Sequence, residues 1–433
     1  METINQQIGK YRWTICTLIF FATTINYLDR QVIGILKPWL EKEVGLGEAE
    51  YGYIVTAFQF AYALGMILAG RIIDKLGTKI GYAMALFGWS IAAILHAFAA
   101  GPVGFGFFRA LLGITEAGNF PAAIKATAEW FPKKERALAT GIFNSGANVG
   151  AVLAPLTVPF IAETWGWEWA FILTGAIGLL WLVFWFIFYE VPNKQKRLSA
   201  AELAYIESDK EEAEVVGEKL PWSKLLKYRQ TWAFAVGKFL TDPIWWFFLF
   251  WIPGWLNDVR GVSVTGSGFG ISLAVIYTST TFGSIFGGWL SSFFLKKGWT
   301  AFKARATSML IFAFMVVPIL FVQNENVGLW GAIALISLAA SAHQAWSANI
   351  FTTVSDMFPK KAIGSVTGIG GMAGAIGGML VAVLAGNILE FYKAQGNVDA
   401  GYLILFIIAA FAYLIALLVM NLIAPKWQRI QDL

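Results

Sequence analysis

The sequence has little charge, two histidines and a single cysteine. Asp, Glu, Lys and Arg together make up 14% of its 433 residues, against about 25% in soluble domains. One cysteine, Cys16, excludes an intrachain disulfide framework. One cysteine and two histidines are also too few to build a common structural zinc site. We therefore expect no metal and no cofactor. We find no nucleophile–base set and no soluble effector domain, which argues against an enzyme or a sensor.

Apolar residues take the place of the missing charge. They make up 58% of the chain, which also has 44 glycines and a mean hydropathy of +0.63. This composition predicts an all-α integral membrane protein whose helices pack closely. The net charge of +5 then reflects basic residues on the cytoplasmic side rather than a nucleic-acid partner.

Twelve segments are long and apolar enough to cross a bilayer, which takes about 20 residues each. The predicted spans are 11–36, 51–70, 79–99, 101–128, 138–162, 169–190, 230–257, 267–294, 303–323, 328–358, 362–390 and 399–424.

One long polar stretch divides the spans. We therefore expect an N-terminal half of six helices at 1–190, a cytoplasmic linker at 191–229 and a C-terminal half of six helices at 230–433. With both termini in the cytoplasm, 25 of the 32 Lys and Arg residues lie on that side, as the positive-inside rule requires. Four lie outside (Lys37, Lys42, Arg260 and Lys393) and three lie within spans.

The two halves are related by an internal repeat. The sequence FPKK at 131–134 recurs at 358–361, and TGI at 140–142 recurs at 367–369. Both repeats follow the ends of corresponding spans, so the halves have the same orientation. Transporters built from such repeats place the substrate near the bilayer midplane.

Six charged residues fall well inside the spans, away from their ends. A charge at the middle of the bilayer costs roughly 2.5–3.5 kcal/mol and marks a candidate functional site. The six are Asp29, Arg30, Arg109, Glu116, Lys238 and Asp242. Three acids and three bases favour internal pairing, and a local pair explains Lys238 and Asp242. A carboxyl group whose arginine partner moves away can exchange a proton near neutral pH. Pro243 is expected to kink or break its helix.

Uncharged polar side chains at similar depth could bind sugar hydroxyls or simply join helices. Asn144 and Asn148 are one turn apart in the fifth span. His343, Gln344 and Ser347 cluster in the tenth. Trp245 is a candidate for stacking on a sugar ring.

The loop after the second span reads GRIIDKLGTK at 70–79. It matches the signature of the major facilitator superfamily, which the whole chain resembles. The resemblance implies twelve transmembrane helices in two pseudo-symmetric halves. It also implies cytoplasmic gating residues, which we place at Gly70, Asp74, Lys75, Lys133, Lys134 and Arg136.

Finer features resemble the anion:cation symporter family, and within it the hexuronate transporters. They are NYLDR at 26–30, EAGNFPAAIKATAEWFPKKER at 116–136, FNSGANVGAVLAP at 143–155, KFLTDPIWW at 238–246 and AHQAWSANIFTTVSDMF at 342–358.

This resemblance implies roles for individual residues. Asp29 and Glu116 are the expected proton-coupling pair, with Arg109 on the same helix face as Glu116. Arg30 is expected to hold the substrate carboxylate, between Tyr27 and Tyr62. The remaining expected substrate-binding residues are Asn144, Asn148, Lys238, Trp245, His343, Gln344 and Ser347.

The sequence therefore predicts a secondary transporter that imports a sugar-acid anion with protons, most closely a hexuronate such as galacturonate or glucuronate. A symporter for an aldonate or another carboxylate is the alternative, and a membrane enzyme or sensor is remote. We expect a monomer in the bacterial inner membrane with no nucleic-acid partner.

Overall fold

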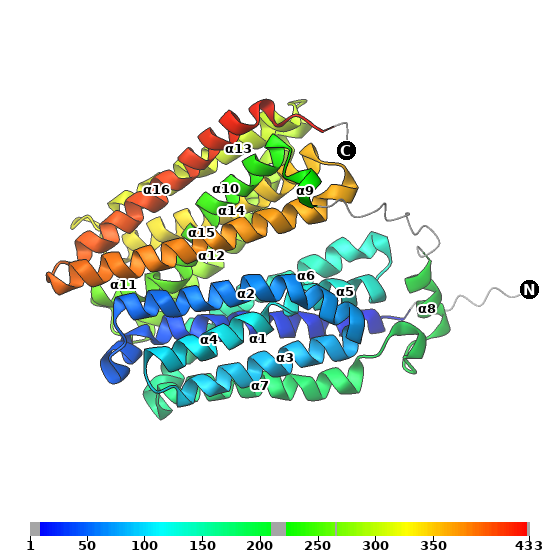
Figure 1. Cartoon of the computed structure of the whole chain (residues 1–433), viewed down its shortest axis with the longest axis horizontal. Helices are drawn as coiled ribbons and strands as arrows, with labels where there is room; N and C mark the ends of the chain where they lie inside the picture. The colour runs from blue at the N-terminus through cyan, green and yellow to red at the C-terminus, as the bar shows by residue number, and fades with distance from the viewer. Residues whose placement is uncertain (1–8, 209–221, 265, 431–433) are drawn as a thin grey trace, which may run out of the picture. The chain divides into compact units, whose positions relative to one another are not determined.

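All the secondary structure in the described part of the chain is helical (Figure 1). The computed structural model describes residues 9–208, 222–264 and 266–430. No strand occurs in these three ranges. The predicted all-α class is confirmed.

Long helices occupy every predicted span. Those before the linker are α1 (Tyr11–Val44), α2 (Glu48–Leu76), α3 (Thr78–Leu95), α4 (Pro102–Glu116), α5 (Asn119–Trp130), α6 (Lys133–Trp165) and α7 (Trp167–Phe188). The linker contains α8 (Ala200–Glu207) and α9 (Trp222–Leu225). After it come α10 (Arg229–Phe250), α11 (Ile252–Asp258), α12 (Ser267–Lys296), α13 (Ala301–Val316), α14 (Leu329–Met357), α15 (Lys360–Ala394) and α16 (Val398–Ile423).

Helices α3, α6, α7, α10, α12, α13, α15 and α16 contain spans that are apolar enough to cross a membrane on composition alone. The other predicted spans lie in α1, α2, α4–α5 and α14, which contain Asp29, Arg30, Arg109 and Glu116 among their candidate site residues. Their polar side chains lower the hydropathy of segments that are otherwise long enough to cross.

Two predicted spans are interrupted. The span at 101–128 breaks at Ala117 and Gly118, directly after Glu116, so α4 and α5 are separate helices. The break expected at Pro243 does not occur, because α10 continues to Phe250. The interruption comes at Trp251 instead, and Pro253 lies in the first turn of α11, where a missing N–H costs nothing.

The chain forms two compact units by its internal contacts. The first comprises Met1–Val32, Phe60–Ala154 and Ile161–Val215, and the second comprises Ile33–Gln59, Pro155–Phe160 and Val216–Leu433. The C-terminal part of α1 and the N-terminal part of α2 thus belong with the second unit. The division predicted at 190 and 229 stays a prediction.

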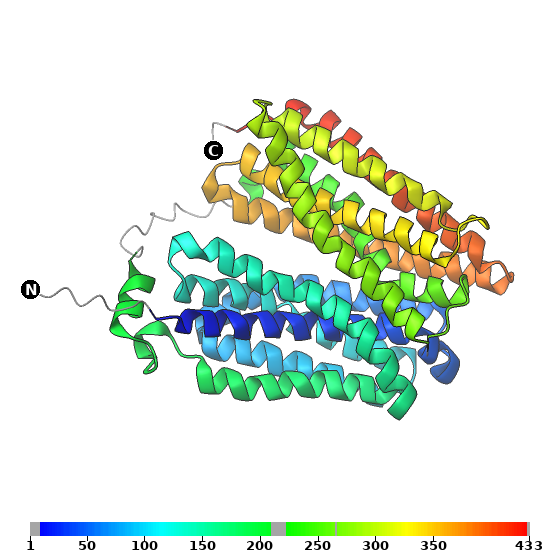
Figure 2. The same cartoon turned by 180° about the vertical axis from the view of Figure 1, so that it is seen from behind.

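Within the first unit α3 packs between α4 and α7, and α3 runs alongside α7 (Figures 1 and 2). Helix α6 approaches the backbone of α1 closely. A Cβ on Gly146 would lie 2.5 Å from the Phe20 carbonyl oxygen, and one on Gly150 would lie 2.3 Å from that of Thr24. Only glycine permits this contact, a small-residue packing common between membrane helices.

Within the second unit α10 packs on α15 and α16, and α14 packs on α12 and α13. The α12–α14 contact also depends on glycine, since a Cβ on Gly283 would lie 2.2 Å from the Ser341 carbonyl oxygen. Bulky rings fill the interior of this unit, and Trp251, Trp255 and Trp346 are completely buried.

Candidate functional site

The first unit has a buried ion pair between α1 and α4. The Nε and Nη2 atoms of Arg30 donate to Oε2 of Glu116 at 3.0 and 2.9 Å. Arg30 is 3% exposed and Glu116 is fully buried. Oε1 of Glu116 accepts no hydrogen bond from any described residue. The guanidinium is therefore held by one carboxylate oxygen, and the other oxygen is open to a proton.

Two aromatic rings flank the Arg30 guanidinium. Its central carbon lies 4.7 Å from the ring centroid of Tyr27 and 4.8 Å from that of Tyr62. Rings at this distance attract a cation through their quadrupoles. The structure thus brings together three residues that the sequence predicted to share a site.

Arg109 supports this arrangement from α4. Its Nη2 donates to the backbone carbonyl oxygen of Arg30 at 2.7 Å, and the side chain is completely buried. A cation that binds this carbonyl fixes the position of α1 at Arg30. Arg109 is thus a positioning residue by its geometry, and its predicted part in proton coupling stays a prediction.

Asp29 is the second buried acid of this unit. It is 2% exposed, and Thr174 of α7 acts on its carboxyl group as a hydrogen-bond donor without reaching ordinary hydrogen-bond geometry. The charges of Glu116 and Arg109 both act on it. Burying an unbonded carboxylate is costly, whereas the protonated form loses far less on desolvation.

Asn26 is a residue of this site that the sequence analysis missed. Nη2 of Arg30 donates to its Oδ1 at 3.4 Å. The signal was present, because Asn26 and Arg30 are four residues apart and so share one face of α1. Asn148 and Asn144 lie on α6, half-buried and exposed respectively. A Cβ on Gly150 would lie 3.0 Å from the Cβ of Tyr27, so the α6 turn that carries Asn148 lies against Tyr27.

The second unit has its own polar cluster, on α10, α14 and α16. Lys238 and Asp242 form an ion pair at 2.7 Å, as their spacing suggested. The ammonium group also lies 4.1 Å from the ring centroid of Phe351.

His343 lies beside this pair. It makes a 2.7 Å hydrogen bond with the hydroxyl of Tyr413, and its ring stacks on Trp245 with centroids 5.3 Å apart. Gln344 and Ser347 lie half-buried on the same helix, α14. Nothing in the sequence pointed to Tyr413, because its contact with His343 depends on how α16 packs.

The predicted gating residues lie where α2 leads into α3 and where α5 leads into α6. Lys75 is exposed at the end of α2, and Gly70 lies in the same helix. The side chains of Asp74, Lys133, Lys134 and Arg136 lie outside the described ones. Beside them Glu129 accepts hydrogen bonds from Thr78 and Tyr189, at 2.6 and 2.5 Å.

A further ion pair at this end joins Lys79 to Glu190 at 2.8 Å. The hydrogen bond from Lys79 holds the pKa of the Glu190 carboxyl below its usual range. This end of the unit is therefore held together by charged contacts among its own helices.

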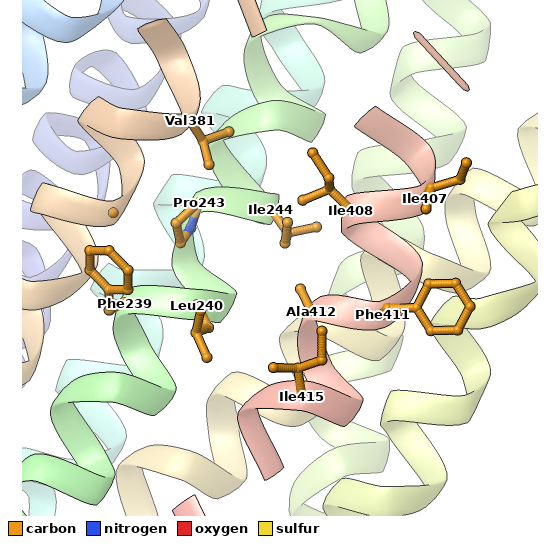
Figure 3. Close-up of a pocket in the computed structure, with 11 residues that line it drawn as sticks. Phe239, Leu240, Pro243, Ile244, Val381, Ile407, Ile408, Phe411, Ala412 and Ile415 are labelled. Carbon is orange, nitrogen blue, oxygen red and sulfur yellow. The ribbon is translucent and has the colours of Figure 1, made fainter. Parts of the chain in front are cut away.

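A cavity of about 500 Å³ opens among α10, α15 and α16 (Figure 3). Its wall is entirely apolar and includes Leu240, Pro243, Ile408 and Phe411. Figure 3 shows side chains of α10 and α16 facing each other across it. Because it offers no cation or hydrogen-bond donor, this cavity does not fit an anionic ligand.

Comparisons with known proteins agree with the geometry. Residues 19–382 match the Major Facilitator Superfamily. The chain is 32% identical to the hexuronate transporter of Escherichia coli (strain K12) over 391 residues, which are 89% of each protein. It is 31% identical over 395 residues to the D-galactonate transporter of Escherichia coli O6:H1, covering 89% of this chain and 90% of that protein.

A solved structure shares the fold. It is a bacterial homologue of the human lysosomal transporter Spinster, in an inward-facing and occupied conformation. The match has a TM-score of 0.78 at 18% sequence identity and covers 98% of this chain and all of the other. On the family match, the helical fold and the buried charges, this chain is an integral membrane transporter that belongs to the major facilitator superfamily.

Proposed function

We propose that this protein is a proton-coupled symporter that imports a sugar-acid anion, most closely a hexuronate, by alternating access. The observation that carries the proposal is the buried Arg30–Glu116 pair between Tyr27 and Tyr62. It supplies a carboxylate-binding fork, a carboxyl group able to exchange a proton and aromatic surfaces within one unit. Hexuronate and galactonate transport are the named activities of relatives with 32% and 31% identity.

The charge of the pair couples the proton to the anion. Arg30 and Glu116 together are neutral, and a buried net charge is costly. Protonation of Glu116 leaves the guanidinium with one uncompensated positive charge. A substrate carboxylate can then take the place of Glu116 in two-point contact with Arg30. Proton and anion thus enter together, because either one alone leaves net charge in the site.

Asp29 provides a second proton site. Burial of its carboxyl group favours the protonated form whenever the pocket is dry. A monoanion that travels with one proton moves no net charge, whereas with two protons it moves one positive charge inward. The membrane potential would then drive import by about 2.3 kcal/mol per 100 mV.

The polar cluster of the second unit is the proposed source of contacts to the sugar. His343, Gln344 and Ser347 offer donors and acceptors for hydroxyls, and Trp245 offers a ring face. Lys238 adds positive charge when Asp242 is protonated or displaced. On the first unit, Asn144 and Asn148 serve the same purpose. We also propose that the gating residues are Gly70, Asp74, Lys75, Lys133, Lys134 and Arg136. The proposal further includes cytoplasmic termini, an inner-membrane location and a monomer.

An aldonate is the alternative substrate, favoured by the similarity to the D-galactonate transporter. The two classes differ in shape. A hexuronate closes into a ring with an apolar face that can stack on an aromatic side chain, whereas an aldonate stays an open chain of hydroxyls.

Uptake into proteoliposomes tests the proposal. Purified protein is reconstituted into vesicles, and a proton gradient directed into the vesicles is imposed. Accumulation of radiolabelled galacturonate is then measured with unlabelled glucuronate or galactonate as competitors. We expect accumulation that a protonophore abolishes and that glucuronate inhibits more strongly than galactonate. Stronger inhibition by galactonate would assign an aldonate, and accumulation unaffected by the protonophore would refute proton coupling.

A further inference from the structure

A second set of charged residues lies within the second unit, at the side of the membrane predicted to be external, and two of them, Lys37 and Glu48, are buried. The set comprises Lys37 and Glu41 of α1, Glu48 of α2, Asp258 of α11, and Glu390 and Lys393 of α15. The function proposed above uses none of these residues. In sequence, the first three belong to the N-terminal half and the last three to the C-terminal half.

Ion pairs connect the set. Lys37 pairs with Glu48, and its ammonium group lies 3.9 Å from a carboxyl oxygen of Asp258. Lys393 pairs with Glu41 and lies 3.5 Å from Glu48. Each lysine therefore joins α1 or α2 to a helix from the other half of the sequence.

Backbone contacts extend the connection. The carboxylate of Glu390 accepts hydrogen bonds from the backbone N–H groups of Glu48 and Ala49, at 2.9 and 3.2 Å. These are the first N–H groups of α2, which have no partner within their own helix and attract negative charge. A residue of α15 thus completes the first turn of α2.

Glycines bring these two helices together just below the charges. A Cβ on Gly52 of α2 would lie 2.6 Å from the Ala382 carbonyl oxygen of α15. A Cβ on Gly386 of α15 would lie 2.7 Å from the Glu48 carbonyl oxygen. The contact is backbone to backbone, so it can part and re-form without leaving a large side chain exposed.

The charges of the set do not cancel. Carboxyl oxygens of Glu41, Glu48 and Asp258 lie within 4.8 Å of one another, and with Glu390 there are four acids for two lysines. Lys37 and Glu48 are each only 1% exposed. Two like charges at such distances repel each other, so the carboxylates can stay together only while the ammonium groups lie between them. The hydroxyl groups of Tyr51 and Tyr402 and the carboxylate of Glu50 also face this set.

We propose that these six residues form an ionic clasp that holds the external ends of α1 and α2 to α11 and α15 and that must open in every transport cycle. Removal of either lysine leaves repelling carboxylates, so the closed form is lost as a whole rather than by degrees. The inference rests on the proposed function, because it assigns a step to the alternating access of that transporter.

Reversible cross-linking tests the clasp. In a Cys16→Ser background, Glu41→Cys and Lys393→Cys are joined by a short thiol-specific reagent that a reductant cleaves. Since Cys16 is the only native cysteine, the reagent acts at the two introduced sites alone. The matched control joins Lys79→Cys and Glu190→Cys, an ion pair of similar length that lies wholly within the first unit.

We expect the clasp cross-link to lower transport at least tenfold and the reductant to restore it, while the control cross-link leaves transport unchanged. Full transport by the cross-linked clasp would overturn the proposal, as would failure of the two cysteines to be joined.

A second measurement needs no transport substrate. Thr56→Cys places a thiol on α2, where the native hydroxyl lies 3.3 Å from the Met379 carbonyl oxygen of α15. We expect Lys393→Glu to raise its labelling by a membrane-impermeant maleimide several-fold, and Lys393→Glu with Glu41→Lys to return it toward the original rate. Equal rates in all three proteins would refute the clasp even if sugar-acid transport were confirmed. Loss of transport in the unmodified protein would refute the proposed function alone.

Discussion

Arg30 makes three kinds of contact at once: an ion pair with Glu116, cation–π contacts with Tyr27 and Tyr62, and a hydrogen bond with Asn26. The rings and the amide can hold the guanidinium in place while its anionic partner changes. A site built in this way can exchange one carboxylate for another without a large movement of the cation.

Glu116→Gln should abolish proton-driven accumulation. The amide resembles the protonated acid in shape and charge, so Arg30 is left available to substrate whatever the pH. One pH unit is worth about 1.4 kcal/mol, or tenfold accumulation for one proton. We expect the ratio of internal to external substrate concentration under a pH gradient to fall to about one in proteoliposomes. Exchange of internal for external substrate should continue.

Glu190→Gln is the matched control for that variant. It removes an acid of an ion pair in the same unit, at a half-buried position just after the apolar span Trp167–Phe188. It should accumulate substrate as the wild type does. Undiminished accumulation by Glu116→Gln would show that proton coupling lies elsewhere.

Arg30→Lys tests the geometry of the carboxylate site rather than its charge. Lysine keeps the positive charge but cannot offer two parallel N–H groups. A hydrogen bond to a charged group is worth about 1.5–3 kcal/mol, so we expect the substrate Kd to rise about ten- to hundredfold, as measured by a thermal-shift titration.

Arg197→Lys is the corresponding control, because that arginine is exposed in the linker. Its affinity should match that of the wild type. An unchanged Kd for Arg30→Lys would move the carboxylate to a different cation.

At the scale of helices, glycine sets how closely α1 and α6 approach. Gly150→Ala would place a methyl group 2.3 Å from the Thr24 carbonyl oxygen and so force the helices apart. Overpacking of this kind costs about 1–3 kcal/mol. We expect a lower Tm of the purified protein and weaker transport, since Tyr27 lies against the same turn.

The same substitution at Gly141 separates packing from helix propensity. This glycine is also in α6, but no atom lies within 4 Å of a Cβ placed there. Alanine should stabilise the helix by up to about 1 kcal/mol or leave it unchanged. If both variants had the same Tm, close contact between α1 and α6 would not be the reason for glycine at 150.

The helices themselves could be predicted from the sequence because length and apolar composition determine them locally. The positions at which the helices break could not be predicted from the sequence. Pro243 has the stronger sequence signal, yet α10 continues through it and breaks at Trp251. Pairs of buried charges could be predicted only within one helix. Lys238 and Asp242 are neighbours on α10, whereas Arg30 and Glu116 meet only because α1 packs on α4.

At the scale of the whole molecule, the number of protons decides whether transport is electrical. When Glu116 and Asp29 are both protonated, each monoanion crosses with two protons, so one net positive charge moves inward. Substrate added to protein on a solid-supported membrane should then give an inward positive current. Asp29→Asn should abolish the current while electroneutral uptake continues. A wild-type protein that transports without current would limit coupling to one proton.

The contrast between strongly and weakly apolar spans also bears on how the protein is made. A charged side chain at the centre of a helix opposes its release from the translocon into lipid by roughly 2.5–3.5 kcal/mol. Helices α3 and α7 are apolar enough to pass from the translocon into lipid without a partner helix. Helix α4 is not, because it contains Arg109 and Glu116. Helix α4 is therefore stable in lipid only once it has packed beside α1 and α3 and Arg30 has neutralised Glu116. Biogenesis of the first unit thus depends on helices that are already in the membrane.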